Sequence, residues 1–243
     1  AIPGLQRGPC QVVTEQVADV DSKDMGWPQW RVLAQRTLHF LCQSDIVAVV
    51  VTHGTDTLEE TAYFLSCVLP QEVLANKALV LTCAMRPASS VAPDGPQNLR
   101  DAIQASCAPG AHGVLVVCAG TVFAARDVQK VHPYRLNAFD SGDAGPLGYL
   151  EEGGVRWVKP CPLVGTDGMQ LMNRLPELTW PRVEIVFSHA GADGALVRTL
   201  CAAVATDAEP VRGLVIAATG NGTVHHALEV ALLQAQLQGI RVV

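Results

Sequence analysis

The sequence predicts an α/β protein with a doubly wound, mostly parallel sheet and a second, smaller α/β domain. Short runs of β-branched and other apolar residues alternate with longer amphipathic segments, a pattern typical of βαβ units. Nearly all of the short runs are apolar on both faces, as expected for parallel strands that helices cover on two sides. A new strand–helix–strand series begins after Pro181, so we expect a large domain over residues 1–178 and a smaller one over residues 179–243.

Six segments carry the strand pattern. They cover residues 45–52, 78–83, 112–118, 182–188, 212–219 and 240–243. Between residues 139 and 181, glycines and prolines interrupt the periodicity, so we expect irregular β-structure there, followed by a linker to the second domain.

Start and stop signals mark four helices between these strands. They are expected over residues 28–42, over 57–68, from Asp94 and Pro96 onward, and over 223–238. Residues 57–60 read Thr-Leu-Glu-Glu, which is a capping box for the second helix. Gly239 stands at the expected left-handed end of the last helix.

The composition narrows the possible partners. Charged residues make up 16% of the chain, below the roughly 25% of typical soluble domains, so part of the surface is expected to face another subunit. The net charge is -6 and the basic residues are scattered, which argues against a nucleic-acid partner. No apolar stretch approaches the roughly 20 residues that cross a bilayer, so no membrane helix is expected.

The eight cysteines are spread evenly, without a Cys-x-x-Cys pair or a cluster with zinc-ligand spacing. We expect most of them to be small buried hydrophobic residues rather than disulfide partners. Cysteines that are free rather than paired in disulfides favour a reducing compartment for this protein.

A dense group of polar residues directly follows the first strand. Residues 52–57 read Thr-His-Gly-Thr-Asp-Thr and lead into a helix. Ligands of open parallel sheets bind beyond the carboxyl ends of the strands, and the free N–H groups of a helix start favour a developing anion. Thr55, Asp56 and Thr57 all compete for one helix cap, which favours a functional site over a turn whose side chains only cap the helix.

Lys130 follows the strand that ends at Cys118 and is expected near the same edge of the sheet. A desolvated lysine can lose its proton and act as a general base toward a hydroxyl, whereas the alternative is a solvated surface lysine.

His53 is expected to be structural. His225 and His226 are adjacent, so they point in different directions on a helix and form no metal pair. Dinucleotide, Walker, nucleophile-elbow and zincin motifs are absent from the sequence.

Five motifs follow one another along the chain. They are Thr-His-Gly-Thr-Asp-Thr-Leu-Glu-Glu-Thr-Ala at 52–62, Ala-Met-Arg-Pro at 84–87 with Asp-Gly-Pro-Gln-Asn-Leu at 94–99, Arg-Asp-Val-Gln-Lys at 126–130, Gly-Pro-Leu-Gly-Tyr at 145–149, and Gly-Asn-Gly-Thr at 220–223. Together they resemble the bacterial-type L-asparaginase family, also called the asparaginase/glutaminase family. The resemblance extends over essentially the whole chain.

The resemblance implies hydrolysis of the side-chain amide of L-asparagine, and often of glutamine, with release of ammonia. The family uses a threonine nucleophile and an acyl-enzyme ester, without a metal or an organic cofactor. Carried over by position, Thr55, Asp56 and Lys130 would be the catalytic residues. Thr55 would position or activate a hydroxyl or water, and Lys130 would tune its proton. Such help is needed because an amide is a poor electrophile.

The same resemblance implies a set of substrate contacts. Asp56 would hold the α-amino group, Ser22 the α-carboxylate, and the Ala84 carbonyl the leaving amide nitrogen. Gly54 and Lys23 lie beside these positions in the motifs. Asn221 would reach the substrate from a neighbouring subunit, so the resemblance implies a homodimer or a homotetramer.

The chain also departs from the family. The Thr-Gly-Gly-Thr loop with the family's other threonine, the tyrosine lid and a C-terminal acidic residue are absent, so we expect that pieces at both ends are missing. Lys23 stands where better-known members have Gln or Glu, which leaves the preference for asparagine or glutamine open. The cysteines do not reproduce the disulfide of periplasmic members, which favours the cytoplasm and leaves the periplasm open.

Three alternatives to an asparaginase stay open at this point. The first is a glutamine-preferring amidohydrolase, and the second is an amidotransferase subunit that acts on aminoacyl-tRNA, against which the acidic net charge argues. The third is a binding module that keeps the amino-acid pocket but lacks the first threonine.

Overall fold

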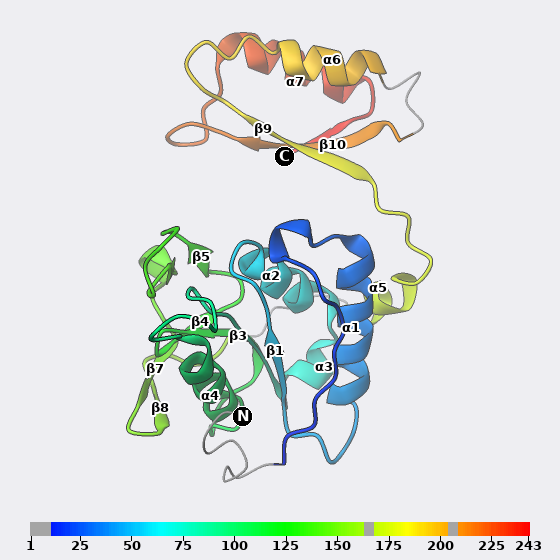
Figure 1. Ribbon diagram of the computed structural model, residues 1–243. Helices are drawn as coiled ribbons and strands as arrows, with labels where there is room; N and C mark the ends of the chain where they lie inside the picture. Colours follow the sequence, from blue (N-terminus) through cyan, green and yellow to red (C-terminus); the bar gives the residue numbers. More distant parts are fainter. Residues whose placement is uncertain (1–10, 163–167, 204–208) are drawn as a thin grey trace. The chain divides into compact units, whose positions relative to one another are not determined.

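The structure is a computed structural model that describes residues 11–162, 168–203 and 209–243. The chain divides into two compact units, residues 1–177 and 178–243 (Figure 1).

The first unit is built on a mixed six-stranded sheet. In sheet order, its strands are β1 (Val49–Thr52), β2 (Ala78–Thr82), β3 (Gly113–Cys118), β4 (Thr121–Ala124), β7 (Gly148–Glu151) and β8 (Gly154–Trp157). The strands β1, β2 and β3 are parallel, whereas β4, β7 and β8 extend the sheet in antiparallel fashion. The hairpin β7–β8 therefore gives regular structure to part of the segment that the sequence predicted to be irregular.

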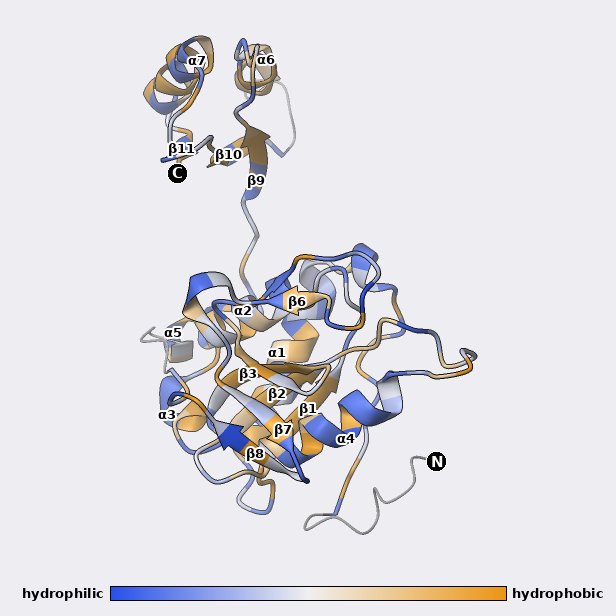
Figure 2. Ribbon diagram, turned by 90° about the vertical axis from the view of Figure 1, so that its left-hand side faces the viewer, coloured by the Kyte–Doolittle hydropathy of each residue, from blue (hydrophilic) through white to orange (hydrophobic). Residues whose placement is uncertain are grey.

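Helices cover both faces of the parallel strands. They are α1 (Trp27–Leu41), α2 (Leu58–Val68), the short α3 (Gln71–Leu74), α4 (Gly95–Ser106) and α5 (Gly168–Arg174). Ala102 and Ala105 of α4 pack against Val80 of β2 and Val117 of β3 in one core cluster. Every residue of β2 and β3 is buried, so the residues between those that face α4 are covered from the other side as well. Figure 2 shows the hydrophobic residues concentrated on these central strands.

Three smaller elements complete the first unit near the carboxyl ends of the strands. A short hairpin joins β5 (Gln129–Lys130) to β6 (Phe139–Asp140), and two 3-10 helices are formed by η2 (Ser22–Asp24) and η3 (Gly142–Ala144). Both η2 and β5 carry residues that the sequence predicted to be functional.

The start of α2 corrects one prediction. Thr57 is the N-cap residue of α2, but its side chain makes no capping hydrogen bond, so the predicted capping box is not formed. The Thr57 hydroxyl instead donates to the backbone carbonyl of Ser22 at 2.6 Å. The Thr57 hydroxyl therefore bonds to a residue that is distant in sequence instead of capping its own helix, and it links η2 to the start of α2.

The cysteines only partly follow the prediction of burial. Cys83, Cys118 and Cys161 are buried, whereas Cys42 is exposed and Cys67, Cys107 and Cys201 are intermediate. The expectation that most are buried was therefore wrong for the described cysteines. Cys10 lies outside the described residues. Among the described helices, none is long and apolar enough to span a membrane.

The second unit is a three-stranded parallel sheet with two helices. Its strands β9 (Arg182–Phe187), β10 (Val211–Ala217) and β11 (Arg241–Val242) lie in the order β11-β10-β9. The helices α6 (Ala195–Ala203) and α7 (His226–Leu237) bury a cluster that includes Val197, Leu214 and Leu228. Gly239 has φ 83°, which confirms the predicted left-handed end of α7.

One expectation does not hold for the second unit. Ile185 and Phe187 of β9 are 64% and 68% exposed, so the described residues of the second unit by themselves cover only one face of this sheet. The apolar strand faces predicted two covering layers, which is correct for β2 and β3, whereas the second unit by itself supplies one layer over β9. In addition, α7 begins at His226, after His225 as its N-cap, rather than at residue 223.

The central strands should dominate the stability of the first unit. Leu81 in β2 is fully buried, so Leu81→Ala should lower the free energy of unfolding by about 2–5 kcal/mol, through lost burial and the cavity it leaves. Val91 is fully exposed, and Val91→Ala should change that free energy by less than about 0.5 kcal/mol. Urea unfolding followed by tryptophan fluorescence measures both. Equal effects of the two substitutions would contradict this assignment of the core.

Candidate functional site

Lys130 joins two segments that are far apart in the sequence. Its ammonium Nζ donates hydrogen bonds to Thr55 Oγ1 at 2.8 Å and to Asp56 Oδ1 at 2.6 Å. Its backbone N–H donates to the carboxylate of Glu59 in the first turn of α2. The Lys130 side chain is 18% exposed, so it is not a freely solvated surface lysine. The structure thus brings together Thr55, Asp56 and Lys130, the three residues that the family resemblance groups as catalytic.

Thr55 and Asp56 lie in the turn between β1 and α2. Thr55 Oγ1 is 3.4 Å from Asp56 Oδ1, which is a long hydrogen bond, and the Asp56 side chain is 52% exposed. The cluster is therefore shielded at the lysine and open to solvent at the carboxylate. A small polar ligand can reach Asp56 without displacing the chain.

Ser22 supports this turn from η2. The side chain is buried, and its Oγ accepts a hydrogen bond from the backbone N–H of Asp56 at 3.1 Å. A Cβ atom at Gly54 would lie 2.4 Å from Ser22 Oγ and 2.7 Å from Ser22 Cβ. Only glycine fits this close approach, so Gly54 allows Ser22 to sit directly against the turn.

His53 has a structural environment, as the sequence predicted. Its Nδ1 lies 2.7 Å from the Gly54 carbonyl oxygen and its Nε2 lies 3.0 Å from Thr61 Oγ1. The Trp30 indole donates to the same threonine oxygen at 2.8 Å. Burial lowers the pKa of His53, although its bond with the Gly54 carbonyl opposes that shift. The ring therefore links α1, α2 and the turn rather than facing the Thr55–Lys130 pair.

Lys23 does not join the cluster. Its Nζ forms ion pairs with its acidic neighbours, at 2.9 Å with Asp21 and 3.0 Å with Asp24, and the side chain is 60% exposed. The hydrogen bond with Asp21, followed by that with Asp24, raises the pKa of Lys23. The structure thus directs this side chain toward solvent and its own acidic neighbours, and it does not place Lys23 on Thr55 or Asp56.

The turn after β2 is held by residues that the sequence did not assign to a site. Ala84 is exposed, and the amides of Met85 and Arg86 donate to the Asp94 carboxylate at 2.9 and 2.8 Å. Asn98, which is buried, donates to the same carboxylate at 3.1 Å. The sequence signal was the spacing of Asp94 and Asn98, which places both at the start of α4 on one helix face.

Asn221 belongs to the second unit. It lies in an exposed turn that a bridge between Thr219 and Thr223 closes. The expected contribution of Asn221 to the site of a neighbouring subunit stays a prediction.

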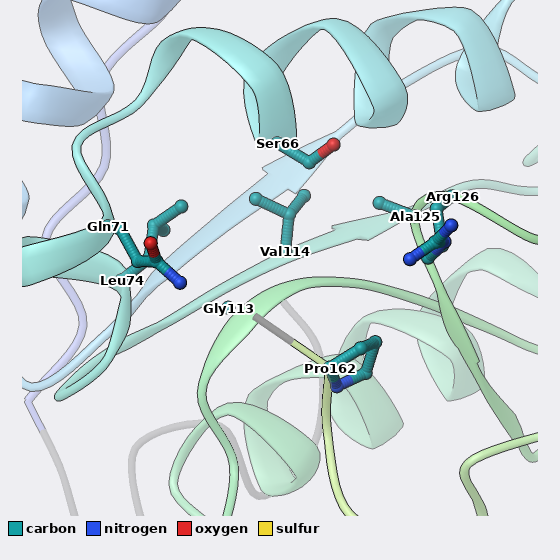
Figure 3. Close-up of a pocket in the computed structure, with 8 residues that line it drawn as sticks. All are labelled: Ser66, Gln71, Leu74, Gly113, Val114, Ala125, Arg126 and Pro162. Atoms are coloured by element: carbon teal, nitrogen blue, oxygen red, sulfur yellow. The ribbon is translucent and has the colours of Figure 1, made fainter. Parts of the chain in front are cut away.

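A pocket at the other end of β3 is separate from this cluster. Gly113 and Val114, at the amino end of β3, line it together with Ser66, Gln71, Leu74, Ala125, Arg126 and Pro162 (Figure 3). It has room for about one water molecule, which is too little for an amino acid. Within the described residues, no group of three or more His, Cys, Asp or Glu side chains is arranged to hold a metal ion.

Comparison with known proteins identifies the relatives of the chain. A family model described as "Asparaginase, N-terminal" matches residues 1–162. The chain is 35% identical over 246 residues to L-asparaginase 2 of Escherichia coli, covering 100% of this chain and 66% of that protein. It is 31% identical over 232 residues to a glutaminase-asparaginase of Pseudomonas fluorescens, covering 94% and 60% of the two chains. The chain thus spans two thirds or less of the length of these relatives.

A solved structure shows the same fold. The crystal structure of a probable cytoplasmic L-asparaginase from Campylobacter jejuni matches with a TM-score of 0.83 and 30% sequence identity. The match covers 99% of this chain and 74% of that one. It confirms the α/β fold with a mostly parallel sheet and an additional smaller domain.

The contact between Gly54 and Ser22 is directly testable. Gly54→Ala should displace η2 and destabilise the first unit by about 1–3 kcal/mol, because the new methyl group would overlap Ser22. Gly154→Ala is the matched control, since a Cβ there would have its nearest neighbour at 3.9 Å. Thermal unfolding, together with proteolysis of residues 11–26, reports both effects. A Gly54→Ala protein as stable as the control would show that the close approach is not real.

The burial of His53 predicts a pH dependence of stability. Because the folded state lowers the pKa of His53 below 6.5, the unfolded chain binds its proton first as the pH falls. Stability should therefore decrease as the pH falls from above 6.5 toward the lowered value, and His53→Asn should reduce this slope. His226→Asn, at a side chain that is 89% exposed, is the control. Urea midpoints above and below pH 6.5 measure the slope, and identical slopes in wild type and His53→Asn would contradict the assignment.

Proposed function

Because the chain belongs to the asparaginase family, we propose that it is an amidohydrolase that converts L-asparagine to L-aspartate and ammonia. The observation that carries this proposal is the contact of Lys130 with both Thr55 and Asp56. The names of the relatives support an amide substrate, since they include an L-asparaginase and a glutaminase-asparaginase. Localisation in the cytoplasm is supported by the name of the Campylobacter relative, whereas a Haemophilus influenzae relative named a probable periplasmic L-asparaginase supports the periplasmic alternative.

The proposed reaction proceeds through an ester. A threonine oxygen attacks the side-chain amide carbon, its proton passes to the amide nitrogen, and ammonia leaves as the C–N bond breaks. Water then attacks the ester carbon, the proton of that water returns to the threonine oxygen, and the carboxylic acid product is released. One water is consumed for each ammonia formed.

Thr55 and Lys130 would perform the proton transfers. Lys130 can accept a proton from the hydroxyl or water at Thr55 only as a neutral amine. The α-ammonium of the substrate at Asp56 would share the carboxylate that now stabilises the lysine charge.

The other contacts would orient the amino acid. The Asp56 carboxylate is half exposed and offers a partner for an ammonium group. Ser22 and Ala84 would bind the α-carboxylate and the leaving nitrogen. The partner subunit would add Asn221 in a homodimer or homotetramer, which is a proposal that rests on the family.

Substitutions of the two central residues test the proposal. In the full-length protein, Thr55→Val and Lys130→Met should each lower kcat for ammonia release from asparagine by about 100-fold or more, the usual effect of losing general acid–base catalysis. Lys130→Arg should not restore activity, because a guanidinium keeps the charge but does not lose its proton. Circular dichroism checks that each variant is folded. Wild-type turnover in folded Lys130→Met would overturn the role of Lys130.

The substrate preference is measured in the same assay. One of the relatives is named an L-asparaginase and the other a glutaminase-asparaginase, so kcat/KM is compared for asparagine and glutamine. A higher value for asparagine is the expected result, and a higher value for glutamine would replace the proposed substrate. If neither amide is hydrolysed but asparagine binds, the binding-module alternative is favoured.

A further inference from the structure

Two buried thiols meet between the carboxyl ends of neighbouring strands. Cys83 directly follows β2, Cys118 ends β3, and the parallel register that pairs Thr82 with Val117 places the two cysteines beside each other at the next position. The Sγ atoms are 3.7 Å apart, with Cys83 donating to Cys118. Neighbouring strands lie about 4.8 Å apart, which falls within the Cα separation of about 4.4–6.8 Å that disulfides require. The two cysteines therefore lie close enough for a disulfide to form once the flanking backbone shifts to bring the sulfurs together.

We propose that Cys83 and Cys118 form a reversible disulfide in response to a peroxide, and that this bond rearranges the turn at Ala84. The proposal concerns a modification site, and only its link to catalysis rests on the proposed function. Neither cysteine belongs to the five motifs on which the family resemblance rests.

The hydrogen bond between the two thiols favours Cys118 as the sulfur that attacks the oxidant. The hydrogen bond from Cys83 lowers the pKa of the Cys118 thiol, whereas the same bond raises the pKa of Cys83. The thiolate is the reactive form of cysteine, so Cys118 reacts first. Both residues are at least 95% buried, so we expect them to react with small reagents, such as hydrogen peroxide as the oxidant and dithiothreitol as the reductant, rather than with a protein partner.

The oxidation balances with hydrogen peroxide as the oxidant. The Cys118 sulfur attacks one peroxide oxygen, the O–O bond breaks, and the first water leaves, giving a sulfenic acid. The Cys83 sulfur then attacks the Cys118 sulfur, the S–O bond breaks, and the second water leaves. Two thiols lose two electrons and two protons, and one peroxide becomes two waters. A dithiol reductant reverses the change by thiol–disulfide exchange.

Asn98 connects this pair to the turn at Ala84. Its Nδ2 donates to the Cys83 carbonyl at 2.9 Å, and its Oδ1 accepts from the Ala119 amide at 3.1 Å. The same Nδ2 donates to Asp94, whose carboxylate holds the amides of Met85 and Arg86. Bringing the two sulfurs from 3.7 Å to the roughly 2.0 Å of a disulfide would pull on both backbone groups that Asn98 holds.

Peptide mapping tests the bond itself. Full-length protein is treated with hydrogen peroxide, alkylated and digested with trypsin, which gives peptides 78–100 and 101–126 because the Arg86–Pro87 bond resists cleavage. A cross-link between these peptides that dithiothreitol removes is the expected result. Peptide 101–126 also contains Cys107, so the experiment is repeated with Cys107→Ser. Absence of the cross-link in that variant, with Cys83 and Cys118 both recovered as alkylated thiols, would overturn the proposal.

Two further measurements test the effect on the turn. After oxidation, the amides of Met85 and Arg86 should exchange hydrogen faster, and ammonia release should fall about tenfold or more, since small misplacements are costly at a reacting centre. Dithiothreitol should restore both, Cys118→Ala should remove the response, and Cys42→Ser should retain it. A cross-link with unchanged exchange would overturn the rearrangement. A protein that forms the cross-link and changes exchange but is inactive before oxidation would refute the proposed function and leave the disulfide supported.

Discussion

The hydrogen bonds of the Lys130 ammonium with Thr55 and Asp56 span 75 and 74 residues of sequence. They hold the β5–β6 hairpin against the turn that leads into α2, and Glu59 adds a second link through the Lys130 backbone. Since the lysine side chain is largely shielded while Asp56 is half exposed, the pair has one sheltered and one accessible end. The proposed chemistry depends on this asymmetry, because a base needs shelter and an amino-acid ligand needs access.

The turn itself depends on close packing with η2. Ser22 fits against Gly54 only because glycine lacks a side chain. The Thr57 hydroxyl donates a hydrogen bond to the Ser22 carbonyl and does not cap α2. His53 fixes the start of the same turn against α1 and α2. The carboxyl end of β2 is supported differently, through Asp94 and Asn98, and this second support encloses the Cys83–Cys118 pair. The two turns thus rest on separate networks that meet at one edge of the sheet.

Local patterns in the sequence predicted much of this arrangement. Continuous apolar runs located β2 and β3, and Gly239 located the end of α7. The grouping of Thr55 and Asp56 was visible because these polar residues follow a strand directly. The contact with Lys130 was not predictable from spacing, because loop geometry rather than periodicity brings β5 to the turn. The same reason explains why Thr57 bonds to Ser22 and why Lys23 turns to its acidic neighbours. The contact between Cys83 and Cys118 was missed for another reason, because it depends on the register between β2 and β3, which the apolar pattern of each strand does not fix.

A double-mutant cycle on Thr55 and Lys130 tests the central claim most directly. Ammonia release by the full-length protein is compared for wild type, Thr55→Val, Lys130→Met and the double variant, each shown to be folded. Residues that act as one unit are strongly non-additive. The contact predicts that the double variant loses no more activity than the more impaired single variant. Losses that multiply would contradict it, because they would show that Thr55 and Lys130 act independently.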